Sequence, residues 1–232
     1  MNSVTREMLL PVASAIRPVL NRIVFTGMEG CRELFDVAEN RVRGAALRTV
    51  ATKALATVPL DRIATELTAG GLVRSGRTTD EEKWTLPGGR HISVCACATE
   101  SPESLDAMIR EYATLLVRTI TLSPEITIQV SAPPVLLAVW WRHHETCSIP
   151  IIDSPHIEDI LELVIRYSAV VEDVRGLPAE LRAVVAHAAS SLIAEDSCEW
   201  MIARALTDAR GTPSAATPVV GRFRQIASMR TA

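Results

Sequence analysis

Cysteine and histidine are the residue types in this chain best suited to hold a metal or attack a substrate. Cys95 and Cys97 lie two residues apart, so on a strand both side chains would point to the same face. The next donors are His143, His144 and Cys147, and no second closely spaced cysteine pair completes a zinc site. The five cysteines are odd in number and scattered, as is typical of reduced, buried thiols. We therefore predict no metal site here.

Basic side chains form a second candidate site. Arg41, Arg43 and Arg48 cluster around Gly44, and Arg74, Arg77 and Arg90 lie near the predicted hairpin. If the sheet brings these arginines together, they form a basic surface that could contact RNA or a nucleotide phosphate. Lys53, on the second predicted strand, could bind a phosphate group without a metal. The alternative is that these cations face water and pair with neighbouring acids, which is the commoner situation for surface charges. Spacing alone leaves both interpretations open.

The run from Trp140 to His144 concentrates aromatic and basic side chains. A stacking platform for a nucleic-acid base is one interpretation of this run. However, adjacent residues on a helix point about 100° apart, so Trp140 and Trp141 could not both stack on one ligand. Core packing is the favoured interpretation.

The elements that must position these residues alternate between helix and strand in the first half of the chain. Apolar spacing predicts helices over 5–20, 29–42 and from Leu60 to Gly70-Gly71. Apolar and β-branched runs bounded by turn residues predict strands over 22–26, 48–58, 72–75, 83–86 and 90–98. Pro87-Gly88-Gly89 predicts a hairpin between the last two strands.

The second half reads mainly as helix. Ser101-Pro102 and Ser154-Pro155 are helix starts, and Pro133-Pro134 opens a very apolar helix after a strand over 126–130. Two or three further helices are expected over 177–228. The fold class is therefore α/β (α+β), with a mixed-sheet domain over 1–130 and a helical domain over 131–232.

Composition sets few limits on function. The 232 residues carry a net charge of −3, which gives no overall attraction to nucleic acid or anionic membrane. No run reaches the length of about 18 apolar residues that a membrane-spanning helix needs. We expect a cytoplasmic protein with no membrane partner.

The order of these elements, with four short segments, resembles a known family. The segments are Ile23-Val-Phe-Thr-Gly27, His91-Ile-Ser-Val94, Ser131-Ala-Pro-Pro-Val-Leu-Leu-Ala138 and Ile157-Glu-Asp-Ile-Leu161. Together they resemble nucleotidyltransferase-fold proteins of the AbiEii abortive-infection type and their mycobacterial toxin relatives. The resemblance covers about residues 15–205.

The resemblance implies a site that has lost its chemistry. The family places two carboxylates on the second strand and a third on the hairpin strand to hold Mg²⁺, and here we expect Thr52, Ala54 and Ser93 at those positions. Trp140 stands where the family has a lysine, and His156 where it has an acid. The residues left for binding a nucleotide or phosphate are Gly27, Gly30, Arg48, Lys53, Glu158 and Asp159.

Three hypotheses follow. The first is a pseudoenzyme without catalytic residues, cofactor or metal that binds a cognate toxin or antitoxin protein, tRNA, or a second copy of itself. The second is an active nucleotidyltransferase that uses Mg²⁺ and transfers a nucleotide to tRNA or protein through other acids, namely Asp36, Glu39, Asp61 or Glu66. The third is an unrelated α/β binding module.

Overall fold

The computed structural model describes residues 3–34, 52–78, 80–97, 103–208 and 216–231, and it divides into two compact units. Unit 1 contains the described residues up to Ala132, and unit 2 contains those from Pro133 onward. No helix in the described ranges is long and apolar enough to cross a membrane.

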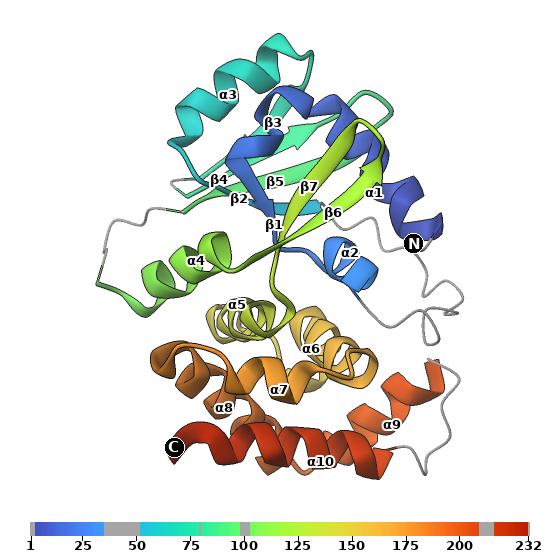
Figure 1. The fold of residues 1–232 in the computed structure, drawn as a ribbon, viewed down its shortest axis with the longest axis vertical. Coiled ribbons are helices and arrows are strands. Elements are labelled where there is room, and N and C mark those ends of the chain that lie inside the picture. Colours follow the sequence, from blue (N-terminus) through green and yellow to red (C-terminus); the bar gives the residue numbers. More distant parts are fainter. Residues whose placement is uncertain (1–2, 35–51, 79, 98–102, 209–215, 232) are drawn as a thin grey trace. The chain divides into compact units, whose positions relative to one another are not determined.

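The described part of unit 1 forms a mixed seven-stranded sheet in the order β3-β4-β5-β2-β1-β7-β6 (Figure 1). Two strand pairs are parallel, β2 with β5 and β1 with β7, and the other four are antiparallel. This architecture confirms the predicted α/β (α+β) class. The strands are β1 (Ile23–Phe25), β2 (Thr52–Ala56), β3 (Val73–Arg77), β4 (Glu81–Thr85), β5 (His91–Ala96), β6 (Val117–Ser123) and β7 (Ile126–Ser131).

One face of this sheet holds the hydrophobic core of unit 1. The core joins side chains of the sheet to α1 (Ser3–Ala15), the following 3₁₀ helix η1 (Arg17–Arg22) and α3 (Leu60–Ala69). As predicted, Gly70 and Gly71 end α3, and Gly71 has the positive φ of 83° that favours glycine. Gly88 and Gly89 likewise have positive φ in the turn between β4 and β5.

Helix α4 (Leu105–Leu115) contacts β2 and β7 on the opposite side of the sheet from α3 (Figure 1). The predicted start at Ser101 is wrong, because α4 begins three residues later than Pro102. Its N-cap is Ser104, whose hydroxyl accepts a hydrogen bond from the Ala107 amide at 3.1 Å. Ser131 of β7 donates to the Ala113 carbonyl at 2.6 Å and so joins this helix to the sheet.

Unit 2 is helical. The guanidinium of Arg222 in α10 (Ala216–Ala227) caps the C-terminal end of α6 (Pro155–Arg166). It donates hydrogen bonds to the Val164 and Ile165 carbonyls at 2.7 and 2.9 Å, and no amide of the helix itself reaches these two acceptors. The elements are α5 (Pro133–Thr146), η3 (Ile151–Asp153), α6 (Pro155–Arg166), α7 (Val170–Arg175), α8 (Ala179–Ala194), α9 (Cys198–Asp208), α10 (Ala216–Ala227) and η5 (Ser228–Thr231).

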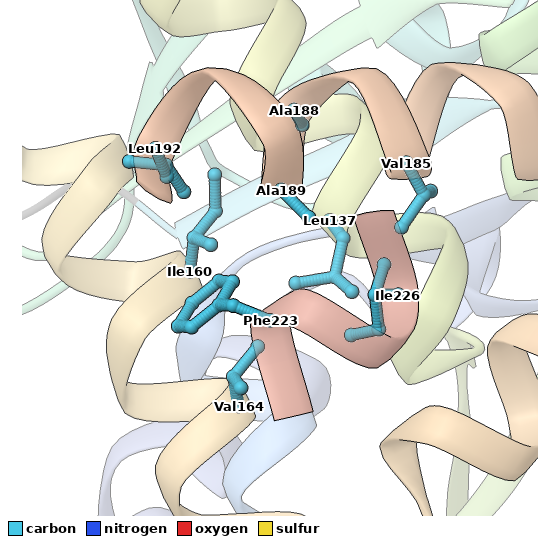
Figure 2. A pocket seen from close by; sticks show the side chains of 9 residues that line it. All are labelled: Leu137, Ile160, Val164, Val185, Ala188, Ala189, Leu192, Phe223 and Ile226. Carbon is cyan, nitrogen blue, oxygen red and sulfur yellow. The ribbon is translucent and has the colours of Figure 1, made fainter. Parts of the chain in front are cut away.

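A small apolar pocket lies between four of these helices (Figure 2). Leu137 of α5, Val164 of α6, Ala189 of α8 and Phe223 of α10 are among its lining side chains. The lining carries no charged or polar side chain, so the pocket has nothing to orient a polar ligand. We regard it as a feature of core packing.

Two other predictions differ from the structure. The helix expected over 29–42 is the single turn α2 (Met28–Cys31) followed by the 3₁₀ turn η2 (Arg32–Leu34), and residues 35–42 lie outside the described ranges. Strand β6 was not predicted. It pairs with β7, and only Ile120 and Leu122 of its side chains are buried, so its apolar signal is short.

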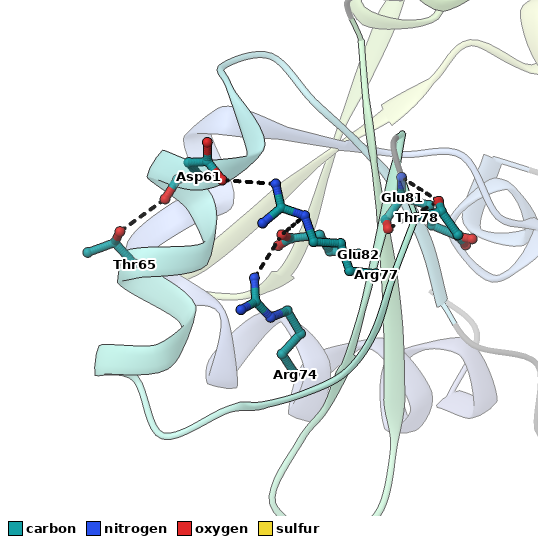
Figure 3. Close-up of polar contacts among 7 residues, drawn as sticks. All are labelled: Asp61, Thr65, Arg74, Arg77, Thr78, Glu81 and Glu82. Carbon is teal, nitrogen blue, oxygen red and sulfur yellow. Dashed lines mark hydrogen bonds and ion pairs between the residues drawn. The ribbon is translucent and has the colours of Figure 1, made fainter.

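A buried carboxylate on β4 contacts two arginines of the neighbouring strand β3 (Figure 3). Glu82 of β4 is fully buried and accepts a hydrogen bond from Arg74 at 3.2 Å, and Arg77 lies 3.6 Å from the same oxygen. Arg77 also reaches Asp61 of α3 at 3.3 Å, and the Arg74 guanidinium lies 5.9 Å from the Trp84 ring centroid. These contacts attach β3 to β4 and α3 through charge.

Replacing Arg74 and Arg77 together by alanine should lower the free energy of unfolding by about 3–5 kcal/mol, because Glu82 would keep a buried charge without its partners. Urea unfolding followed by circular dichroism measures this. The control is Arg62→Ala, an exposed arginine of α3, which should change stability by no more than about 0.5 kcal/mol. Equal effects of the two changes would show that Glu82 does not depend on the arginine pair.

Candidate functional site

The candidate site is the face of β2 and β5 that points away from the core of unit 1. Ala54 and Ala56 of β2 and Ile92 and Val94 of β5 all belong to the core. Side chains alternate along a strand, so Lys53 on β2 and the residues between the core positions of β5 point to the other face. Lys53 lies directly opposite Ser93 in the register of the two strands.

This register corrects the expected metal positions. Thr52 and Ala54 share the core face, whereas Ser93 shares the opposite face with Lys53. The expected convergence of Thr52, Ala54 and Ser93 on one pocket therefore does not occur. A shift of one residue moves every side chain of a strand to its other face, and the residues of β2 on the candidate face are Lys53 and Leu55.

Two rows of side chains cross this face. Lys53, Ser93 and Lys83 occupy adjacent positions on β2, β5 and β4, and Leu55, Cys95 and Glu81 occupy the next row. Ser93 is buried and Lys53 is partly buried. Lys83 and Glu81 form an ion pair at 3.8 Å. The face thus combines two ammonium groups, a thiol and one carboxylate.

Cys95 is a poor nucleophile in this setting. Burial raises the pKa of its thiol to about 11, and the nearby Glu81 carboxylate acts in the same direction. The thiolate is the reactive form, so very little is present at neutral pH. His91 cannot activate Cys95, because its Nδ1 hydrogen-bonds to the Thr85 hydroxyl at 3.1 Å, four strand positions from the thiol.

The segment after β1 holds a carboxylate against the backbone. Gly27 at the start of α2 has an extended backbone, and a Cβ there would overlap the Glu29 carboxylate. Burial raises the pKa of Glu29, and its own backbone amide, Arg32 and Lys53 oppose this shift. Glu29 therefore lies near both Gly27 and Lys53, two of the predicted binding residues, and sequence reasoning did not select it.

Gly30, another predicted binding residue, has a packing role. A Cβ at Gly30 would lie 3.0 and 3.1 Å from the two γ-methyl groups of Val130 on β7. Only a glycine lets α2 approach the strand this closely without displacing those methyl groups. Met28 between the two glycines is buried.

The remaining predicted residues lie in unit 2 or outside the described residues. Arg48 lies outside the described residues. Trp140 is buried within α5 with 1% of its surface exposed, as core packing requires. At the start of α6, the His156 ring lies 5.2 Å from that of His143, and Glu158 lies 3.8 Å from Arg204. Asp159, also in α6, belongs to unit 2 with them.

The residues present do not fit the Mg²⁺ that the sequence resemblance implies. In the part of the chain that the structure describes, no group of three or more His, Cys, Asp or Glu residues could hold a metal ion. Mg²⁺ prefers carboxylate oxygens as ligands. On the candidate face, β2 instead carries the ammonium group of Lys53 and the hydrocarbon side chain of Leu55.

Two solved structures share the fold. The crystal structure of JHP933 from Helicobacter pylori superposes with a TM-score of 0.50 and 7% identity, over 100% of this chain and 95% of that chain. A structure described as a "putative nucleotidyltransferase" from H. pylori superposes with a TM-score of 0.50 and 8% identity, over 99% of this chain and 96% of that one. No family model and no curated relative matches. The chain has a nucleotidyltransferase-like fold.

Gly30→Ala should lower the free energy of unfolding by about 1–3 kcal/mol, because the added methyl group overpacks against Val130. Combining it with Val130→Ala should recover part of that loss in a double-mutant cycle. Gly221→Ala is the matched control. Apart from its chain neighbours and the backbone of α10 itself, nothing lies within 4 Å of the Cβ position, so this change should stabilise the protein by up to about 1 kcal/mol. A destabilisation of equal size at both positions would contradict the packing explanation.

Alkylation of Cys95 by iodoacetamide should become about tenfold faster with each pH unit from 7 to 10, because a thiol with a pKa of about 11 remains far from fully ionised in that range. Peptide mapping by mass spectrometry assigns the modified cysteine, and circular dichroism confirms that the protein stays folded. The Cys95→Ala variant identifies the corresponding peptide. A rate that levels off near pH 9 would show that burial does not raise the pKa of Cys95.

Proposed function

We propose that this nucleotidyltransferase-like protein does not carry out metal-dependent nucleotidyl transfer and acts by binding a protein or RNA partner. The observation that carries the proposal is the pair Lys53 and Leu55 on the candidate face of β2. A cation at this position repels Mg²⁺, and a leucine offers no ligand. Ser93 and Cys95 on β5 do not supply the missing negative charge.

The same face is better suited to an anion. Lys53 and Lys83 lie on either side of the buried Ser93, so a phosphate group of RNA or of a nucleotide would meet two ammonium groups. Glu29 and Glu81 limit the positive charge of the face. Because the two carboxylates offset part of the charge of the two lysines, the face would hold a phosphate best when a larger partner makes further contacts elsewhere.

An active nucleotidyltransferase is the second candidate. Asp61 pairs with Arg77, and Glu66 pairs with Arg22 at 2.5 Å. Both acids lie on α3, whose apolar side chains pack on the core face, away from Lys53. Asp36 and Glu39 lie outside the described residues and are the acids on which this second candidate depends.

The biological setting of the proposal comes from the resemblance of the sequence to AbiEii-type proteins. A protein of this type that has lost catalysis would act in a toxin–antitoxin or phage-defence system. Its partner would be a cognate toxin or antitoxin protein, or tRNA.

Incubation with each α-labelled nucleoside triphosphate, total tRNA and Mg²⁺ or Mn²⁺ should give no label on RNA or protein, because the candidate face cannot hold the metal. An active nucleotidyltransferase assayed in parallel confirms the reagents. Isothermal titration should show that any nucleotide binding is independent of Mg²⁺.

Label transfer by the wild type would overturn the proposal. If it is lost in Asp36→Asn or Glu39→Gln but kept in Glu180→Gln, an exposed acid of α8, the active enzyme is established.

A further inference from the structure

Helix α9 exposes a tryptophan. Trp200 has 54% of its surface exposed, whereas Trp84, Trp140 and Trp141 have 1%, 1% and 6%. Large aromatic side chains bury most of their surface in a folded protein, and exposed ones are enriched where partners bind. The exposure of Trp200 therefore calls for an explanation that the other tryptophans do not need.

A neighbouring arginine holds this ring in place. Arg204 lies one helical turn after Trp200, and its Cζ is 5.5 Å from the ring centroid. The same guanidinium lies 3.8 Å from the Glu158 carboxylate of α6. The ion pair and the cation–π contact restrict both side chains, so a partner would meet a ring that is already ordered.

The surroundings of Trp200 are acidic. Glu195, Asp196 and Glu199 are all exposed, and Glu195 and Asp196 lie in the turn just before α9 begins at Cys198. Burial raises the pKa of the Cys198 thiol, the nearby Glu199 and Glu195 carboxylates act in the same direction, and Arg224 of α10 opposes them. Glu158, which pairs with Arg204, is a fourth carboxylate close to the group that contacts the ring.

We propose that the Trp200 surface, made of Glu158, Glu195, Asp196, Glu199, Trp200 and Arg204, binds a basic segment of a partner protein. An arginine or lysine of that segment stacks on the exposed part of the indole, and its neighbours pair with the carboxylates. This inference rests on the proposed function, which states that the protein acts by binding, and it names the chemistry of one partner.

The charge of the Trp200 surface favours a basic peptide over RNA and over a second copy of the chain. RNA carries a phosphate at every nucleotide, and these would approach a surface with more carboxylates than guanidinium groups. A second copy of the chain in a twofold dimer would bring the same acidic patch against itself, which repels. A basic peptide meets the surface with opposite charge.

The test uses the blocked peptides (Gly-Arg)₄ and (Gly-Glu)₄ with the full chain at low salt. The arginine peptide should protect Trp200 fluorescence from acrylamide quenching, and the glutamate peptide should not. The three buried tryptophans contribute little to quenching, and Trp200→Phe assigns the signal. Binding should weaken about tenfold in Asp196→Lys/Glu199→Lys and in Trp200→Ala, measured by anisotropy of a labelled peptide.

The matched control is Glu180→Lys, which removes an exposed carboxylate of the first turn of α8 and should leave binding within about twofold. Equal binding by wild type and Trp200→Ala, or no protection at millimolar peptide, overturns the Trp200 surface. Tighter binding of oligouridine than of the arginine peptide, or a dimer in sedimentation that Trp200→Ala abolishes, also overturns it. The nucleotide-transfer assay tests the proposed function independently of peptide binding. A failure of the Trp200 surface in the peptide experiments therefore does not change the result of that assay.

Discussion

The alternation of side chains along β2 is the constraint on which the candidate site depends. This strand lies between β1 and β5 and is covered on its core face by helices that need Ala54 and Ala56 to be small and apolar. Once these two alanines face the core, Lys53 and Leu55 must face the other way. The chemistry that this face of the sheet can offer is therefore decided by the identities of Lys53 and Leu55 and by which residues of β2 face the core.

Most of the order of the elements could be predicted from sequence, with β6 missed, and the face of β2 could not. Glycines and prolines mark the ends of α3, the hairpin and the start of α6, so these boundaries have local causes. In β2, however, Ala54, Leu55 and Ala56 are all buried, so no polar–apolar alternation shows which residues face the core. The raised pKa of Cys95 and the position of Glu29 arise from burial, for which the sequence has no local signal.

Helix α5 explains why the aromatic run in the sequence was ambiguous. Every residue from Pro133 to Trp141 is buried, so the helix shows no polar face from which its orientation could be read. Trp140 and Trp141 act as packing residues. The tryptophan that is exposed lies sixty residues later, in a helix whose sequence reads as an ordinary amphipathic segment.

The contacts of β3 have a consequence for how the protein behaves in concentrated solution. An outermost strand offers unpaired amides and carbonyls to which another chain can add, and this leads to aggregation. Here β3 is only five residues long, is interrupted by a bulge between Arg74 and Gly76, and carries two arginines held by Glu82. A second chain pairing with this strand would bring its own Arg74 and Arg77 alongside them. The buried carboxylate thus helps to keep the sheet from extending into a neighbouring molecule.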